Sequence, residues 1–488
     1  MGKQFKADQL TNNNHQMFDQ RVLAQLERLK GLIQHPGFSE GPTTLGAELE
    51  MYLVDDQTLL PAGNNLAIID ALSDSRLQPE LNQFNLEYNQ DPTAAQGRPF
   101  SAMHEDFEQF LSRLQRAAST INNLVVPIGI LPTLKQSDLK YENMTNLPRY
   151  QALQEGLYKL RGGDFRINID GKDPLQASCD SVATEGANTS LQIHLKLPAA
   201  KFAAYYNAAQ LSTPLVLGLA ANSPLLFGHQ LWQETRIALF KQSIDCRPNL
   251  VTEWRQPTRV SFGQGWVRQG AYELFAENVG LYPAIMPMVE DEPEDSLKFK
   301  ELCLHHGTVW PWNRAVYGAS PEPHLRIEFR SLPSGPTVKD MIANAALAIG
   351  WAVGLESHVD EILARLPFQY AEHNFYRAAQ SGMEAKILWP VATQTTLGEQ
   401  PLIQVAEKLL PLAHDGLKAL GVLADDIDEY LGIIEQRLQS RQNGSCWQLE
   451  RLNHYRDSYG KDESLKRMLS DYIRHFNDGN PVATWPTQ

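Results

Sequence analysis

Hydrophobic and polar residues alternate along four short segments of the chain, which predicts four strands that each have an apolar face and a polar face. The last segment, HLRIEFR at 324–330, has a polar face made of His324, Arg326, Glu328 and Arg330. The first, TLGAELEMYLVD at 44–55, carries Glu48, Glu50 and Tyr52 on its polar face. The two between them are FNLEYNQD at 84–91, with Asn85, Glu87 and Asn89, and NTSLQIHLKLP at 188–198, with Ser190, Gln192, His194 and Lys196. Such segments are typical of an antiparallel sheet that helices cover on one side.

Helical spacing of apolar residues predicts helices in other stretches. They are 14–34, 103–123, 200–222 and 337–366, followed by an almost wholly helical region from about 400 to the end. In the fourth, Thr337 is placed to cap the helix, with Asp340 at the third position. We therefore expect an α+β fold with a curved antiparallel sheet, a concave active-site face, and helices on the other face. The expected organisation is an N-terminal helix at 1–38, a catalytic domain at 39–390 and a helical C-terminal region at 391–488.

The polar faces of the four strands allow two interpretations. A half-solvated sheet would expose all of them to water, which is common for a single strand. However, Glu48 and Glu50 place like charges side by side on one face, which is unfavourable unless a cation lies between them. Glu87 and Glu328 repeat the arrangement, and His194 adds a nitrogen ligand, so the set suits Mg²⁺ or Mn²⁺. Beside these carboxylates, the guanidinium groups of Arg326 and Arg330 match phosphate oxygens.

Composition narrows the class of protein. The net charge of −14 argues against a broad nucleic-acid-binding surface, although a local arginine cluster can still bind an anionic substrate. The 4 cysteines lie far apart and form no CxxC pair, which favours a reducing compartment. The first ten residues lack the apolar stretch of a signal peptide, and the most apolar segments are short or interrupted. We expect a cytoplasmic protein that binds neither nucleic acid nor a membrane.

Several common motifs are absent from the sequence. There is no GxxxxGK[ST] loop for phosphate, no GxSxG and no HExxH, and the glycines of FGQGWVRQG lack dinucleotide-binding spacing. If the protein is an enzyme that uses ATP, the triphosphate is therefore expected to bind through metal ions.

Four of the segments carry a family resemblance. GAELE, ELNQFNLE, SLQIHLKL and RIEFRSLPSG occur in this order, within about residues 44 to 350. Together they resemble the bacterial glutamate–cysteine ligases and the broader carboxylate–amine ligases that share a glutamine-synthetase-like fold. The resemblance implies an ATP-dependent ligase that forms an amide through an acyl phosphate, with two or three Mg²⁺ or Mn²⁺ ions. Its substrates would be small molecules: ATP, an amino acid or other carboxylic acid, and an amine.

The resemblance also implies roles for individual residues. The metal ligands would be Glu48, Glu50, Glu80, Glu87, His194 and Glu328; the nucleotide-binding residues His194, Lys196, Arg326 and Arg330; the catalytic residues Arg330, Glu328 and Arg259; and the substrate-binding residues Gln192, Arg166, Asn313 and Arg314. Some positions also have an ordinary explanation. Glu80 reads as well as a solvated loop glutamate, and Arg166 as a partner in a loop salt bridge. In VWPWNR, Trp310, Trp312, Asn313 and Arg314 could line the substrate pocket, or the two tryptophans could be core. The adjacent His305 and His306 would face opposite sides of a strand and could not share a metal, so we expect them to be structural.

Two other functions fit the same residues. A phosphotransferase on this fold would move phosphate onto an amine or guanidino group without forming an amide. A non-catalytic relative would bind the nucleotide without turnover. Since an acyl phosphate hydrolyses readily, a ligase also needs covering loops, and the glycine- and proline-bearing stretches 161–174 and 331–336 are candidates.

Overall fold

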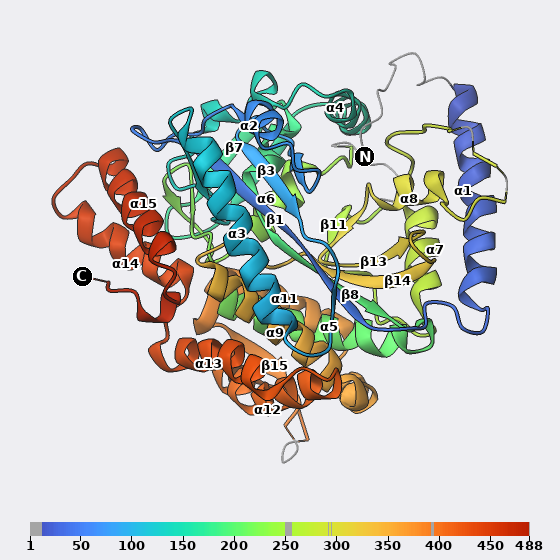
Figure 1. The fold of residues 1–488 in the computed structure, drawn as a ribbon. Helices are drawn as coiled ribbons and strands as arrows, with labels where there is room; N and C mark the ends of the chain where they lie inside the picture. The colour runs from blue at the N-terminus through green and yellow to red at the C-terminus, as the bar shows by residue number, and fades with distance from the viewer. Residues whose placement is uncertain (1–11, 249–255, 291, 294, 392–394, 488) are drawn as a thin grey trace.

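An antiparallel sheet occupies the middle of the computed structural model, which describes residues 12–248, 256–290, 292–293, 295–391 and 395–487 (Figure 1). Six of its strands follow the order β13-β14-β8-β1-β3-β2, and β4 and β5 also pair with β1. The strands are β1 (Thr44–Asp55), β2 (Leu77–Pro79), β3 (Asn85–Asn89), β4 (Thr93–Ala94), β5 (Asn123–Val126), β8 (Leu191–Leu197), β13 (Asn313–Gly318) and β14 (His324–Phe329). All four alternating segments therefore contribute to one sheet.

The register of the sheet brings the polar faces together. Glu50 lies opposite Glu87 on β3, while Glu48 lies opposite Gln192 on β8. On the other side of β8, His194 lies opposite Glu328 of β14. Because residues directly opposite each other in an antiparallel pair point to the same side of the sheet, these side chains share one face.

Helices bury the other face of the sheet. The apolar partners Leu49, Leu195 and Ile327 have no exposed surface. Below them pack α5 (Phe202–Ala220) and α9 (Val338–Gly354), which are apolar on nearly all sides, as expected for helices in the centre of a large core (Figure 1). The Thr337 hydroxyl accepts a hydrogen bond from the Asp340 amide at 3.1 Å, so the predicted helix start is confirmed.

Further helices form an outer layer around this core. Several pack on α5 or α9, among them α11 (Phe368–Ser381), α12 (Leu402–Ala419) and α13 (Ala424–Ser440). The others are α1 (Asn12–Ile33), α2 (Asn65–Leu72), α3 (Pro99–Ser119), α4 (Pro148–Arg161), α6 (Arg236–Ser243), α7 (Ala271–Leu281), α8 (Lys300–His306), α10 (Val359–Leu363), α14 (Gly444–Arg456) and α15 (Lys461–Asp478). The short strands outside the main sheet are β6 (Phe165–Ile169), β7 (Leu175–Cys179), β9 (Leu225–Leu226), β10 (His229–Gln230), β11 (Val260–Ser261), β12 (Trp310–Pro311), β15 (Lys386–Trp389) and β16 (Gly398–Pro401).

The α+β fold, with helices on one side of a curved sheet and a helical C-terminal region, is confirmed, but some details of the prediction are wrong. The stretch 161–174 contains β6 instead of being loop throughout, and the predicted helix at 337–366 is broken after Gly354. The helix α2 lies between β1 and β2. The division into units ending at 38 and 390 stays a prediction; α1 packs on α7 and α8, and α12 packs along α9.

The sequence predicted neither a signal peptide nor a membrane-spanning helix. The first ten residues, on which the signal-peptide prediction rests, lie outside the described ranges. Within those ranges, no single helix is both long enough and apolar enough to span a membrane. Only α9 taken together with its bent continuation to Leu363 reaches the required length and apolar composition, and it does so by length and composition alone.

Candidate active site

The concave face of the sheet encloses a cavity of about 270 Å³. Seven of the residues singled out from the sequence line it: Glu48, Glu50, Glu80, Glu87, Gln192, Arg314 and Arg330. They come from β1, β3, β8 and β13 and from the residues that directly follow β2 and β14, which lie far apart along the chain. The polar strand faces therefore surround a cavity instead of facing bulk water.

Glu48, His194 and Glu328 form one cluster of potential metal ligands. One ligand atom from each lies within 4.8 Å of the others. Arg326 Nε is 3.1 Å from His194 Nδ1, and His194 Nε2 is 3.0 Å from Glu48 Oε1. Two carboxylates and an imidazole are a suitable donor set for Mg²⁺ or Mn²⁺.

Glu328 is the most strongly paired carboxylate in the cluster. Arg314 donates to it from both Nε, at 2.6 Å, and the terminal nitrogen Nη2, at 3.0 Å, and Arg330 donates from Nη1 at 2.6 Å. Burial alone would raise the pKa of Glu328, but the two arginines outweigh it and hold that pKa well below its usual range. Glu328 therefore stays ionised although none of its surface is exposed.

Glu50 is held in place by the edge of β8. Its carboxylate accepts hydrogen bonds from the Ser190 amide at 2.7 Å and from Gln192 Nε2 at 2.9 Å. The side-chain oxygen of Gln192 in turn accepts a hydrogen bond from Arg330. Burial raises the pKa of Glu50, although the nearby arginines Arg330 and Arg236 oppose the rise. Gln192 thus links a carboxylate to the arginine across the cavity.

Glu80 and Glu87 are acidic groups that lie close to other carboxylates. Burial and the neighbouring carboxylates raise the pKa of Glu87 to about 8, and burial and Glu87 raise the pKa of Glu80 well above its usual value. Asn89 Nδ2 donates a hydrogen bond to Glu87 at 2.7 Å. Carboxylates that lie close together raise one another's pKa values unless a cation lies between them, so this donor set fits a divalent ion.

The predicted nucleotide-binding residues lie along the same face. Arg326 is opposite Lys196 in the pairing of β14 with β8, and Lys196 Nζ is 3.5 Å from the Glu40 carbonyl. Neither residue lines the cavity, whereas Arg330 does. Arg330 Nε is buried and has no hydrogen-bond partner among the described residues, so a donor is left for an anionic ligand. Beyond the cavity, the polar face of the sheet therefore continues with the cationic side chains of Lys196 and Arg326.

Three further predicted site residues lie off the polar face of the sheet. Asn313 lies on the helix-covered face, because it is opposite Phe329, and it donates to Gln210 and Thr213 of α5. Arg166 is exposed on β6, whose alternation turns Phe165 and Ile167 inward. Arg259 is buried and donates to Cys246 Sγ and to the Thr308 and Pro283 carbonyls. Asn313 is therefore turned away from the cavity, and the roles of Arg166 and Arg259 stay predictions.

The structure also places the two tryptophans of VWPWNR and the adjacent pair of histidines. Trp310 lines the cavity, whereas Trp312 is buried against Phe240 and Phe375. His305 and His306 belong to a helix, α8, not a strand. Each makes a hydrogen bond to a backbone carbonyl, of Tyr282 and Ala315 respectively, so both are structural, as expected.

Glu185 is a cavity residue that the sequence analysis missed. It lies in the 3₁₀-helix Val182–Ala187, which has neither the period of a strand nor that of an α-helix. Burial, with a smaller contribution from Glu50, raises the pKa of Glu185 to about 8. Tyr150 and Leu153 of α4, with Trp310, form an apolar wall of the same cavity. The position of Glu185 directly before the β8 segment was the only available signal.

Comparisons with known proteins agree with this architecture. A family model described as glutamate-cysteine ligase family 2 matches residues 44–467. Among solved structures, a glutamate–cysteine ligase from Francisella tularensis in complex with AMP aligns over 92% of this chain and 91% of its own, at 11% identity and a TM-score of 0.53. A bifunctional glutathione synthetase from Pasteurella multocida aligns over 95% of this chain and 54% of its own, at 12% identity and a TM-score of 0.45. No curated protein matches the sequence.

The similarity to the Francisella tularensis enzyme shows that the two chains share a fold. The family match extends from the first strand of the central sheet into the last long helix. Because it covers far more than half of the sequence, this chain belongs to glutamate-cysteine ligase family 2.

Proposed function

We propose that this protein joins the γ-carboxylate of glutamate to the amino group of cysteine, or of another amino acid or small amine, through an acyl phosphate. Membership of the family makes the chain an ATP-dependent ligase that forms C–N bonds. The observation that carries the finer proposal is the cavity, in which the carboxylates Glu48, Glu50, Glu80 and Glu87 face Arg314 and Arg330.

Two groups of residues would hold the divalent ions. Glu48, His194 and Glu328 form one set, and Glu50, Glu80 and Glu87 line the other end of the same face. Bound ions would neutralise the charge that otherwise keeps a triphosphate apart from a carboxylate. The protein's part is to aim these ligands at one cavity, and Arg314 keeps Glu328 ionised through a two-pronged ion pair.

Arg330 is the residue best placed to contact the transferred phosphoryl group. In the proposed first step, a carboxylate oxygen of glutamate attacks the γ-phosphorus of ATP, and ADP leaves with the electrons of the broken P–O bond. Arg330 is held on one side by Glu328 and Gln192, and its Nε faces no partner among the described residues. A guanidinium oriented in this way stabilises charge on the phosphoryl oxygens without having to reorient.

Glu185 and the apolar wall suit the amine that attacks in the second step. The amine nitrogen bonds to the acyl carbon, phosphate leaves, and the extra proton on nitrogen passes to a carboxylate. Glu185 lines the cavity beside Tyr150, Leu153 and Trp310, so its carboxylate can receive an ammonium group while the wall accommodates a small side chain. A volume of about 270 Å³ lies just below the range of roughly 300–1,000 Å³ for drug-sized ligands, which favours amino-acid-sized substrates.

The nucleotide would then lie over the neighbouring part of the sheet. His194, Lys196 and Arg326 continue the polar face past the cavity and offer nitrogen donors to phosphate oxygens. All four cysteines are free in the structure, which agrees with work in a reducing, cytoplasmic compartment.

An amino-acid panel tests the proposal. The protein is incubated with ATP, Mg²⁺ and glutamate, together with each amino acid or small amine in turn, and ADP, phosphate and the organic product are measured. We expect ADP release that requires both acid and amine, a γ-glutamyl amide by mass spectrometry, and loss of turnover with EDTA. A phosphorylated amine without amide would instead identify a phosphotransferase, and ATP binding without turnover on any pair would identify a non-catalytic relative.

A further inference from the structure

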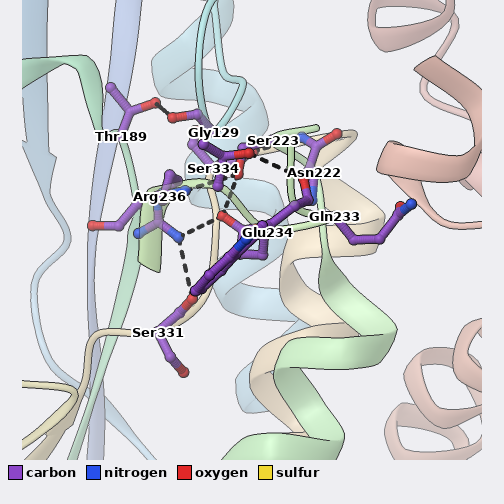
Figure 2. Close-up of polar contacts among 12 residues, drawn as sticks. Gly129, Thr189, Asn222, Ser223, Gln233, Glu234, Arg236, Ser331 and Ser334 are labelled. Carbon is purple, nitrogen blue, oxygen red and sulfur yellow. Dashed lines mark hydrogen bonds and ion pairs between the residues drawn. The ribbon is translucent and has the colours of Figure 1, made fainter. Parts of the chain in front are cut away.

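A buried ion pair lies next to the cavity without lining it. Glu234 has no exposed surface and Arg236 only 2%. Arg236 Nη1 is 3.1 Å from Glu234 Oε1 (Figure 2). Arg236 is the first residue of α6, and Glu234 lies two residues before it. A buried ion pair is a weak source of stability, because desolvating two charges offsets most of their attraction. A pair of this kind therefore calls for a structural or functional explanation beyond stability.

The Glu234 carboxylate holds the turn that follows α5. It accepts a hydrogen bond from the Ser223 hydroxyl at 2.6 Å and another from the Asn222 amide at 2.8 Å. Together with the bond from Arg236, these contacts occupy both carboxylate oxygens (Figure 2). The backbone at 222–223 is consequently tied to the same group that orients the arginine.

Both ends of the segment 331–334 are attached to this network. Arg236 Nη1 donates to the Ser331 carbonyl at 3.2 Å, and Asn222 Nδ2 donates to the Ser334 carbonyl at 2.8 Å (Figure 2). Arg236, a member of the ion pair, makes the first of these bonds. Asn222, whose backbone amide donates to Glu234 of the same pair, makes the second. The segment is therefore anchored at two points that trace back to Glu234.

The segment 331–334 in turn contacts the edge of the active site. The Leu332 carbonyl accepts a hydrogen bond from the Leu191 amide at 3.0 Å, and the Ser334 amide donates to the Thr189 carbonyl at 3.3 Å. Between them, the Ser190 carbonyl accepts from the Glu50 amide at 2.9 Å. The residue immediately before the segment is Arg330. A shift of the segment would thus displace Arg330 and the strand that holds Glu50.

The charge of Arg236 also acts on the cavity. It lowers the pKa of Glu50, against the larger effect of burial, which means that the guanidinium lies close to that carboxylate. Arg236 Nε makes no hydrogen bond among the described residues, so part of the cation is not used for local bonding. Arg236 nevertheless does not line the cavity, so it can affect chemistry there only through other residues.

We infer that Glu234 and Arg236 are positioning residues for the ligase reaction, which hold the segment 331–334 and thereby set the placement of Arg330 and Glu50. The inference rests on the proposed function, because the roles of Arg330 and Glu50 come from it. Misplacing a catalytic group by about 1 Å can lower a rate by about 10²-fold, even when the altered residue never touches substrate.

The test compares two buried arginines. Arg236→Met removes the cation beside the site. Arg437→Met is the matched control, since Arg437 is also buried and ion-paired, with Asp340 at 2.7 Å, but belongs to α13 and does not line the cavity. We expect both variants to unfold at lower temperature. Below both transitions, only Arg236→Met should lose kcat, by about 10²-fold, with little change in the KM for ATP, and Arg236→Lys should recover a large part of the loss.

Amide hydrogen exchange supplies a readout that needs no turnover. The amides of Leu191 and Ser334 should exchange faster in Arg236→Met than in the wild type or in Arg437→Met. If the wild type lacks ligase activity but these amides respond, the proposed function fails while the structural support stands. Unchanged kcat and exchange in Arg236→Met, or equal kcat losses in both variants, would overturn the inference. Should Arg236→Met fail to fold, Glu234→Gln replaces it under the same criteria.

Discussion

Replacing Glu328 by glutamine removes one charge from the centre of the site while nearly preserving its shape. Glu328 is fully buried and accepts hydrogen bonds from Arg314 and Arg330. In the variant, one amide oxygen still accepts, but the amide nitrogen faces guanidinium donors that it cannot accept from. The variant also loses one carboxylate from the cluster with Glu48 and His194. The change therefore affects both metal binding and the orientation of Arg330.

The stability loss can be estimated from the ion pairs. Removing one partner of a buried ion pair costs about 3–5 kcal/mol, because it leaves the other charge uncompensated. Arg314 and Arg330 keep only part of their side chains exposed, 17% and 13%, and can use that access to water to reduce the penalty. We therefore expect a loss near the lower end of that range. We also expect kcat to fall by about 10²–10³-fold or more, because transition-state charge would lose an oriented donor and a metal ligand together.

The assay combines Mg²⁺-dependent ADP release with thermal unfolding followed by circular dichroism. Asp340→Asn is the matched control, because Asp340 is equally buried and ion-paired, with Arg437 at 2.7 Å, but does not line the cavity. Both variants should unfold earlier than the wild type, and only Glu328→Gln should lose ADP release at a temperature where both are folded. Retention of Mg²⁺-dependent turnover by folded Glu328→Gln would refute the assignment of Glu328 to the metal site.

Two other predictions concern the acidic groups of the cavity. Burial raises the pKa values of Glu87 and Glu185 to about 8, so between about pH 4.5 and 8 the folded, metal-free protein holds protons that the unfolded chain has released, and its stability should fall as pH rises through this window. Mg²⁺ should therefore raise the unfolding temperature more at about pH 8 than at about pH 6, and an equal rise at both would contradict a site built on these carboxylates. Glu185→Gln should raise the KM for the amine about tenfold or more while leaving the KM for ATP nearly unchanged, because only an ammonium group loses its counter-charge. Steady-state kinetics beside the exposed-site control Glu155→Gln would check this, and an unchanged KM for the amine would remove Glu185 from the acceptor site.

Local sequence patterns were sufficient to predict the strands, because the alternation of polar and apolar residues can be read within each strand by itself. Alternation in HLRIEFR and TLGAELEMYLVD requires only that one face be buried, so the polar positions Glu48 and Glu328 could be assigned to a face before any strand pairing was known. For Arg166, alternation on β6 says which way the arginine points but not what lies there. For Asn313, the pattern of VWPWNR is too irregular to show which face it takes.

Contacts between distant segments lay beyond such reasoning. Glu185 comes from a 3₁₀-helix without a readable period, and Glu234 and Arg236 act through backbone groups at 222–223 and 331–334 that no side-chain pattern records. The burial that raises the pKa of Glu87 likewise depends on segments far away in the chain.

By itself, then, the sequence determined which side chains leave each strand on its polar side, because the two-residue repeat of an extended chain is a local property. Tertiary structure alone decided that those faces close around one cavity and that Glu328 meets two arginines there, because strand order and register depend on which apolar faces pack together. The proposed chemistry depends on that cavity and therefore on the tertiary structure.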